Sequence, residues 1–217
     1  MDLAGELADV VSAIELPPPG AAGSAKKNYT ERLSGRFTEI IQRRLQDLGL
    51  PRARAPRGRD KQFMGGYGTK GVDVYLSDEK HGLLLSSGTK GIVYDIPKNL
   101  KNRYRDMVME ALELHKRSPF AVCGHLLFLG RAESARPSRA FGTVLGEAVA
   151  LLRSISGRER PDEASEVYET MGVLLLDPGR PDSIDLEPAG VPAELNALSY
   201  CERLVAAFHT RNPFFPK

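Results

Sequence analysis

Residues 70–90, which read KGVDVYLSDEKHGLLLSSGTK, contain the strands that decide the fold. Two runs in this stretch, Val72 to Ser77 and Gly82 to Ser87, have the aliphatic and aromatic content of strands. The polar residues 78–81 between them predict a short turn, so we expect the two runs to pair antiparallel. A further strand, Gln62 to Tyr67, precedes them, and together the three runs predict an antiparallel meander.

A helix is expected on either side of the meander. The first is predicted from Tyr29 to Leu48, where apolar residues recur at helical spacing and Gly49 ends the pattern. The second is predicted from Asn99 to Lys116. Phe120 to Leu129 then follows as a nearly continuous apolar run, which is typical of a strand buried on both faces. This order of elements predicts an α/β fold with a central mixed β-sheet flanked by helices.

The two ends of the chain add further elements to this core. Residues 3–15 have the apolar spacing of a short amphipathic helix, and Pro17 to Pro19 end it. Residues 1–27 are therefore expected to form an N-terminal helical arm and linker, which packs on the core or on a second subunit. Residues 28–217 are expected to form one domain, with helices near 141–156, 164–171 and 193–210 and a strand at 172–176.

The composition limits the function only weakly. The chain has 217 residues and a formal net charge of +2, which is too mild to indicate nucleic-acid binding by itself. Basic residues gather between Lys26 and Arg105, which leaves open a face for a polyanion or a solvated basic surface. Cys123 and Cys201 are expected to be buried free thiols, and no run reaches the ~18 apolar residues of a membrane span. We therefore expect a cytoplasmic protein without a membrane partner.

Asp73 and Lys90 are the residues of the meander that could carry chemistry. A carboxylate can hold Mg²⁺ against a phosphodiester, and a lysine can orient the attacking water and neutralise developing charge. The alternative is an acid at a strand end and an exposed lysine without a catalytic role. The surrounding order of elements favours the catalytic interpretation.

These residues belong to a wider resemblance. The segments Lys70 to Val74, Gly82 to Leu85, Lys98 to Arg103 and Pro119 to Val122, together with Lys90, resemble bacterial restriction-endonuclease-like proteins of the PD-(D/E)XK superfamily. The resemblance implies that residues 28–217 form a nuclease-like domain with a restriction-endonuclease-like core. It implies a DNA endonuclease of restriction or phage-defence type that depends on Mg²⁺ or Mn²⁺. The expected partners are double-stranded DNA, a second copy of the chain and further proteins of a defence system.

The catalytic motif departs from the family pattern at Gly88. The family places Glu or Asp two residues before the lysine, and a glycine has no side chain with which to bind a metal. Glu39 is our first choice for a replacement acid, so that Asp73 and Glu39 would bind the metal beside Lys90. Asp106 and Glu110, in the helix after Lys90, are the alternatives.

Gly88 also keeps other functions open. One is a catalytically inactive nuclease fold that serves as a DNA-binding or complex-forming subunit. Another is an interaction protein without a nucleic-acid partner. Cys123 and His125 lie on the same side of a predicted strand and could bind a metal, although core packing is the favoured interpretation because no second ligand pair has metal spacing.

A set of basic residues is predicted to contact phosphates of the DNA backbone. Five of them lie in or beside a proline-containing loop, and four flank the predicted catalytic residues. They are Arg52, Arg54, Arg57, Arg59, Lys61, Lys70, Lys98, Lys101 and Arg103.

Overall fold

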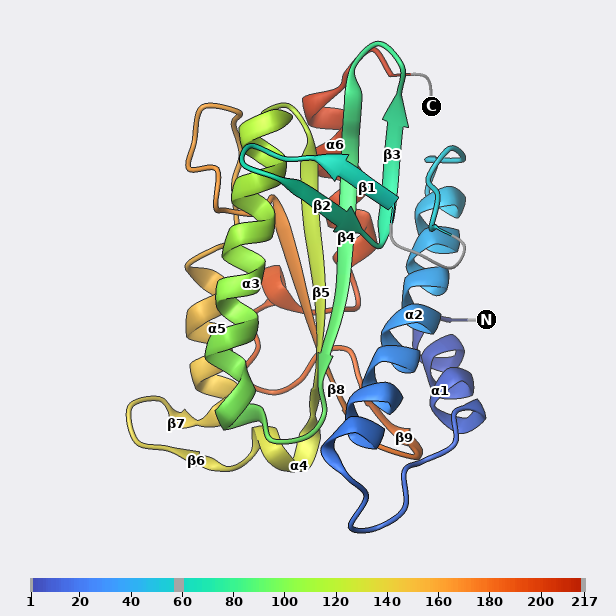
Figure 1. The fold of residues 1–217 in the computed structure, drawn as a ribbon, viewed down its shortest axis with the longest axis vertical. Helices are drawn as coiled ribbons and strands as arrows, with labels where there is room; N and C mark the ends of the chain where they lie inside the picture. The colour runs from blue at the N-terminus through green and yellow to red at the C-terminus, as the bar shows by residue number, and fades with distance from the viewer. Residues whose placement is uncertain (1, 57–60, 216–217) are drawn as a thin grey trace.

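A five-stranded mixed β-sheet lies between two layers of helices in the computed structural model, which describes residues 2–56 and 61–215 (Figure 1). The strand order is β3-β4-β5-β8-β9. The strands span Val74–Asp78 (β3), Gly82–Ile92 (β4), Val122–Gly130 (β5), Thr170–Asp177 (β8) and Arg180–Asp185 (β9). The predicted α/β class, with a central mixed sheet and flanking helices, is confirmed.

The strand pairing confirms the two central sequence predictions. β3 and β4 pair antiparallel across the turn at residues 79–81, with Val74 opposite Ser87. β5 pairs parallel with both β4 and β8, and all nine of its residues are buried. A continuous apolar run is what a strand with helices on both faces requires. β9, an antiparallel edge strand, was not expected, because its sequence Arg-Pro-Asp-Ser-Ile-Asp is mostly polar.

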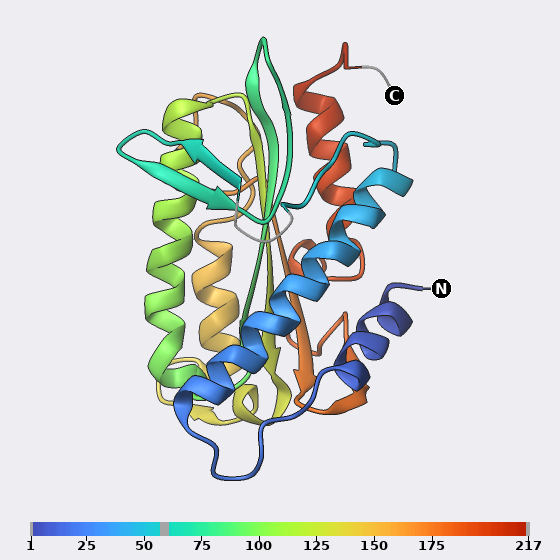
Figure 2. The same ribbon diagram turned by 45° about the vertical axis from the view of Figure 1, so that its right-hand side comes forward.

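Each face of the sheet is covered by its own helices and its own apolar core (Figure 2). One face packs against α1 (Leu3–Ala13), α2 (Gly23–Asp47) and α6 (Tyr200–Arg211). The other packs against α3 (Ile96–Arg117) and α5 (Val144–Arg153). The shorter elements are α4 (Arg131–Ser134), β6 (Pro137–Ser138), β7 (Gly142–Thr143) and the 3-10 helix η1 (Ala193–Leu195).

The N-terminal helix packs directly on the core. Leu7 and Val11 of α1 are buried in the apolar cluster that α1 shares with α2 and α6, and Glu6 pairs with Arg43 and Arg44 of α2 at 2.9 Å each. α2 begins at Gly23, so the expectation that the linker extends to Lys27 was wrong for its last five residues. Only the prolines at 17–19 forbid a helix, and nothing in residues 23–27 does.

A separate β-hairpin precedes the strands of the central sheet in the sequence. It consists of β1 (Lys61–Met64) and β2 (Thr69–Val72), and both figures show it projecting beside α3 (Figures 1 and 2). The predicted single strand over 62–67 was therefore wrong, because the chain turns at Gly65 to Gly68 and returns along β2. Asp73 separates β2 from β3.

Two C-terminal predictions also need correction. The helix expected near 164–171 does not form, because this segment runs into β8, which starts at Thr170, and places Tyr168 and Glu169 in the interior. The helix expected over 193–210 is divided into η1 and α6. In the described part of the chain, no helix is both long and apolar enough to cross a membrane.

Candidate functional site

Asp73 and Lys90 meet beside the junction of β2 and β3, as the sequence predicts for a catalytic pair. Lys90 Nζ lies 3.5 Å from Asp73 Oδ2. The backbone N–H of Thr89 donates to the same oxygen at 2.7 Å, so β4 holds the carboxylate in one orientation. The side chain of Asp73 is 16% exposed and that of Lys90 35%, which leaves both accessible to a ligand.

Glu110 of α3 lies next to Gly88. A Cβ atom placed on Gly88 would lie 3.0 Å from Glu110 Oε1 and only 2.5 Å from Nδ1 of His125. The space that a side chain at position 88 would need is therefore filled by Glu110 and His125. The glycine is a packing requirement of this arrangement, and it brings a carboxylate from another element to the same place.

The electrostatic environment of Glu110 ties it to the Asp73–Lys90 pair. Burial raises the pKa of Glu110 to about 7; Lys90 and Lys70 act in the opposite direction, and Asp73 adds to the increase. The side chain is 16% exposed. Glu110 therefore carries a proton for part of the time at neutral pH and is close enough to Asp73, Lys90 and Lys70 to feel their charges.

His125 lies behind Glu110 on β5. Its ring is fully buried, and neither ring nitrogen has a hydrogen-bond partner among the residues described. Burial, together with the nearby cations Lys90 and Arg103, lowers the pKa of His125 to about 3. The neutral ring has Nδ1 at 3.9 Å from Glu110 Oε1. Burial agrees with the predicted core packing, but no pattern in the sequence indicates that this histidine adjoins the acid.

The other two candidate acids lie on the surface. Glu39 is exposed and pairs with Arg36 at 3.1 Å, and Asp106 is exposed and pairs with Arg103 at 3.3 Å. The neighbouring residues Ile40 and Ile41 belong to the apolar core. Both are buried, but successive helical residues differ by ~100°, so Glu39 points to solvent while its neighbours face inward.

A cleft of about 600 Å³ opens beside Asp73 and Lys90. α2 forms one wall, the first turns of α3 form another, and the end of β4 forms the floor. β3 pairs with β4 only as far as Ser87, so the edge of β4 from Thr89 to Ile92 borders the cleft. We call this space the α2 cleft.

Comparison with known proteins does not identify the chain. No family model, curated protein or solved structure matches it.

The predicted phosphate-contacting residues fall in three places. Arg54 pairs through its backbone with Tyr75 at the edge of β3, and the guanidinium of Arg52 lies 5.9 Å from the ring of Phe215. Lys61 and Lys70 are on the β1–β2 hairpin. Lys98, Lys101 and Arg103 are in the first turns of α3, whereas Arg57 and Arg59 lie outside the described residues. Among the described members of this set, Lys70 lies near Glu110, and Arg103 lines the α2 cleft.

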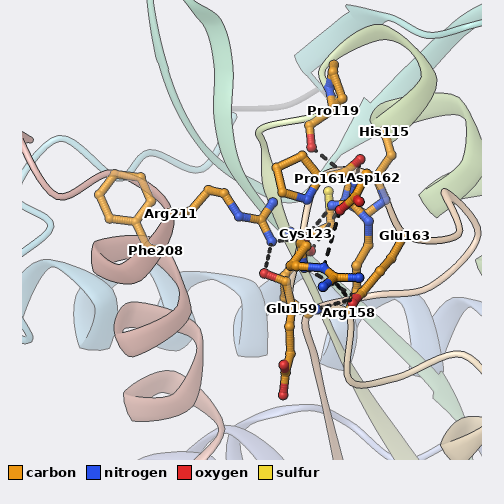
Figure 3. A network of polar contacts seen from close by, with 12 residues as sticks. His115, Pro119, Cys123, Arg158, Glu159, Pro161, Asp162, Glu163, Phe208 and Arg211 are labelled. Carbon is orange, nitrogen blue, oxygen red and sulfur yellow. Dashed lines mark hydrogen bonds and ion pairs between the residues drawn. The ribbon is translucent and has the colours of Figure 1, made fainter.

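A second polar cluster is buried at the N-terminal end of β5, where Cys123 lies (Figure 3). His115, Cys123 and Glu169 offer three ligand atoms within 4.8 Å of one another, a set that could hold a metal. However, Glu169 already accepts hydrogen bonds from Arg158 at 2.7 Å, from Arg211 at 3.2 Å and from the backbone N–H of Cys123 at 2.7 Å.

The charges in this second cluster favour an internal ion network over a metal site. His115 Nε2 lies 3.2 Å from Glu169, and burial would lower the pKa of His115, but Cys123 and Glu169 raise it to about 10. Three cations therefore surround one carboxylate at neutral pH. A divalent cation would have to displace them, since a histidine ligand must be deprotonated. Sequence analysis missed this network because two of its members, Arg158 and Glu169, come from an irregular segment.

Proposed function

We propose that the protein is a DNA endonuclease that depends on Mg²⁺ or Mn²⁺, with Asp73 and Glu110 as metal ligands and Lys90 as the catalytic cation. The observation that carries the proposal is the position of Glu110. Its carboxylate lies where a side chain at Gly88 would extend, beside the paired Asp73 and Lys90. Glu110 thus replaces our first choice, Glu39, as the second acid.

The donor set fits a hard divalent cation. Two carboxylates that each retain some exposure can supply the one or two protein ligands with which Mg²⁺ is commonly held, the remainder being water and phosphate oxygens. When bound, the metal would polarise the scissile phosphate and the attacking water. Glu110 has to release its proton to act as a ligand, because a cation binds the ionised carboxylate.

The chain's own residues have separate tasks in this proposal. The Thr89 N–H orients Asp73, so the carboxylate needs little rearrangement on metal binding. Lys90 places a positive charge at the mouth of the cleft, where charge develops on a phosphate during hydrolysis. His125, neutral and buried, packs beneath Gly88 and beside Glu110.

The order of elements supports the restriction-endonuclease-like core within this proposal. Helix α2, the antiparallel strands β3 and β4, helix α3 and strand β5 follow one another along the chain, which agrees with part of the expected order of helix, three strands, helix and strand. The first of the three expected strands lies instead in the separate β1–β2 hairpin. We propose that the chain from α2 onward, rather than from residue 28 as expected, forms this nuclease-like domain and that it acts on double-stranded DNA as a homodimer in restriction or phage defence. The proposed location is the cytoplasm, where buried thiols such as Cys123 and Cys201 stay reduced.

An inactive nuclease-fold subunit is the second candidate function. It is favoured by Gly88 and by the high pKa of Glu110, because a partly protonated acid binds a metal less readily than an ionised one. Such a protein would bind DNA or a partner protein through the same basic surface without cutting.

Plasmid cleavage separates the two candidates. The wild type, Asp73→Asn and Lys90→Ala are incubated with supercoiled DNA over a range of Mg²⁺ and Mn²⁺ concentrations, and DNA binding is measured in parallel. We expect the wild type to cut and both variants to lose at least ~100-fold in rate while keeping the fold, because each removes a charge from the reacting centre. A wild type that binds DNA but cuts with neither metal would establish the inactive subunit instead.

A further inference from the structure

The centre of the wall that α2 presents to the α2 cleft is built from small polar residues. Thr30, Ser34 and Thr38 recur every four positions after Lys26, and all of them line the cleft. The hydroxyls of Thr30, Ser34 and Thr38 each donate to the backbone carbonyl four residues earlier, at 2.9 to 3.0 Å. These side chains therefore lie flat along the helix and leave the space beside it open.

Gly35 extends this open wall. It also lines the cleft, and beyond the adjoining backbone of α2 itself a Cβ placed on it would meet no described atom within 4 Å. A side chain there would project into free space rather than into the core. Position 35 therefore offers a way to fill the cleft without disturbing the packing of α2.

The floor of the cleft contains a polar group without a partner. Thr89 is fully buried and lines the cleft, and its Oγ1 has no hydrogen-bond partner within residues 2–56 and 61–215. A buried hydroxyl without a partner is costly, and a ligand in the cleft could supply one. Thr89 is also the residue whose N–H orients Asp73, so such a ligand would lie next to the proposed metal site.

The rim of the cleft carries cations that are only weakly engaged. Lys27 pairs with Glu31 at 3.5 Å while both side chains are more than 60% exposed, and exposed pairs of this kind contribute little. Lys26 lies 5.3 Å from the ring of Tyr94, and Arg103 faces from α3. The lining also holds the acids Asp73 and Asp95, and Asp73 is paired with Lys90. Arg103 pairs with the exposed Asp106 at 3.3 Å, so phosphates would meet mainly Lys26, Lys27 and Arg103 along the rim.

We propose that the α2 cleft binds the sugar-phosphate backbone of one DNA strand next to the scissile phosphate, with Lys26, Lys27 and Arg103 contacting phosphates. A single strand is inferred because a space of about 600 Å³ is in the range of small-ligand pockets, roughly 300–1,000 Å³, and admits a short segment of one chain. The proposal rests on the proposed function for the identity of the polymer. It adds contacts on α2 that sequence analysis did not predict.

Filling the cleft tests this assignment. Gly35→Glu adds a bulky negative charge inside the cleft, whereas Arg32→Gln, on the exposed outer face of α2, changes the net charge by the same one unit. Binding of fluorescein-labelled single-stranded DNA is measured in EDTA by anisotropy over a series of salt concentrations. We expect Gly35→Glu to weaken binding about tenfold or more relative to Arg32→Gln. Lys27→Gln should reduce the slope of log K against log salt by about 0.7.

The outcomes separate this inference from the nuclease proposal. If Gly35→Glu binds single-stranded DNA as tightly as Arg32→Gln, or if the wild type does not bind it, the cleft assignment is wrong even where plasmid cleavage is intact. If Gly35→Glu loses binding while the wild type never cuts DNA, the cleft assignment stands and the nuclease proposal fails.

Discussion

The two polar clusters of this protein differ in how completely their charges are paired. Around Glu169, every cation meets the one carboxylate in a dry interior, and Arg158 and His115 have no exposed side-chain surface. Around Asp73 and Glu110, the carboxylates keep some exposure, the pKa of Glu110 is about 7, and within the described residues Thr89 Oγ1 and both ring nitrogens of His125 have no hydrogen-bond partner. A closed network stabilises a fold, whereas an open one beside a cleft is available to a ligand.

The largest expected effect on stability comes from a substitution at Glu169. Glu169→Gln should lower the free energy of unfolding by about 3–5 kcal/mol, because it leaves Arg158, Arg211 and His115 as buried cations without a counter-charge. Urea denaturation followed by circular dichroism measures this change. Glu110→Gln is the matched control and should leave stability nearly unchanged, since Glu110 is already partly protonated at neutral pH. Equal losses in both variants would mean that the two clusters do not differ in kind.

The same network predicts how stability depends on pH. The pKa of His115 is raised to about 10 from an unfolded value of ~6.5, so the folded state binds more protons between these values. Its stabilising contribution is present below pH ~6.5 and is lost as the pH rises through about 10. We expect the free energy of unfolding to decline over this range in the wild type and to decline less in His115→Gln. Parallel curves for the two proteins would contradict the charged state of His115.

Placing an acid at position 88 tests the packing at the open cluster. Gly88→Glu should cost about 1–3 kcal/mol of stability and should not raise activity, because its Cβ would lie 2.5 Å from His125 Nδ1. The measurements are a thermal melt and plasmid cleavage. Gly91→Ala, where a Cβ would lie 2.0 Å from Phe128, gives a comparison with a purely apolar clash on the same strand. A Gly88→Glu variant that is more active than the wild type would show that Glu110 does not fill this role.

A smaller effect is expected in the affinity of the Asp73–Glu110 cluster for a metal, which should depend on pH. The raised pKa of Glu110 means that a proton competes with the metal below about pH 7. The apparent Kd for Mn²⁺, measured by isothermal titration calorimetry, should rise up to about tenfold per pH unit from pH 7 to pH 6. Asp73→Asn should bind too weakly to show this dependence. A Kd that does not change between pH 8 and pH 6 would exclude Glu110 as a ligand.

The fold was largely predictable because its decisive segments carry strong local patterns. The unbroken apolar run of β5 and the polar turn between β3 and β4 placed three strands, and Asp73 and Lys90 met as their strand positions implied. Glu110 was not preferred, since its approach to Gly88 is a tertiary contact that α3 creates and that helix periodicity does not reveal. The helix expected near 164–171 failed because Tyr168 and Glu169 are drawn into the interior by distant partners.

Cleavage by Glu110→Gln and Glu39→Gln, side by side, tests the central assignment most directly. Both substitutions remove one carboxylate, one beside Gly88 and the other on the exposed face of α2 where Glu39 pairs with Arg36. With saturating DNA and a range of Mg²⁺ concentrations, we predict that Glu110→Gln loses at least ~100-fold in cleavage rate. Glu39→Gln should stay within about twofold of the wild type, because exposed ion pairs contribute little. The opposite result, with full activity in Glu110→Gln and loss in Glu39→Gln, would contradict the assignment of Glu110 as the second metal ligand.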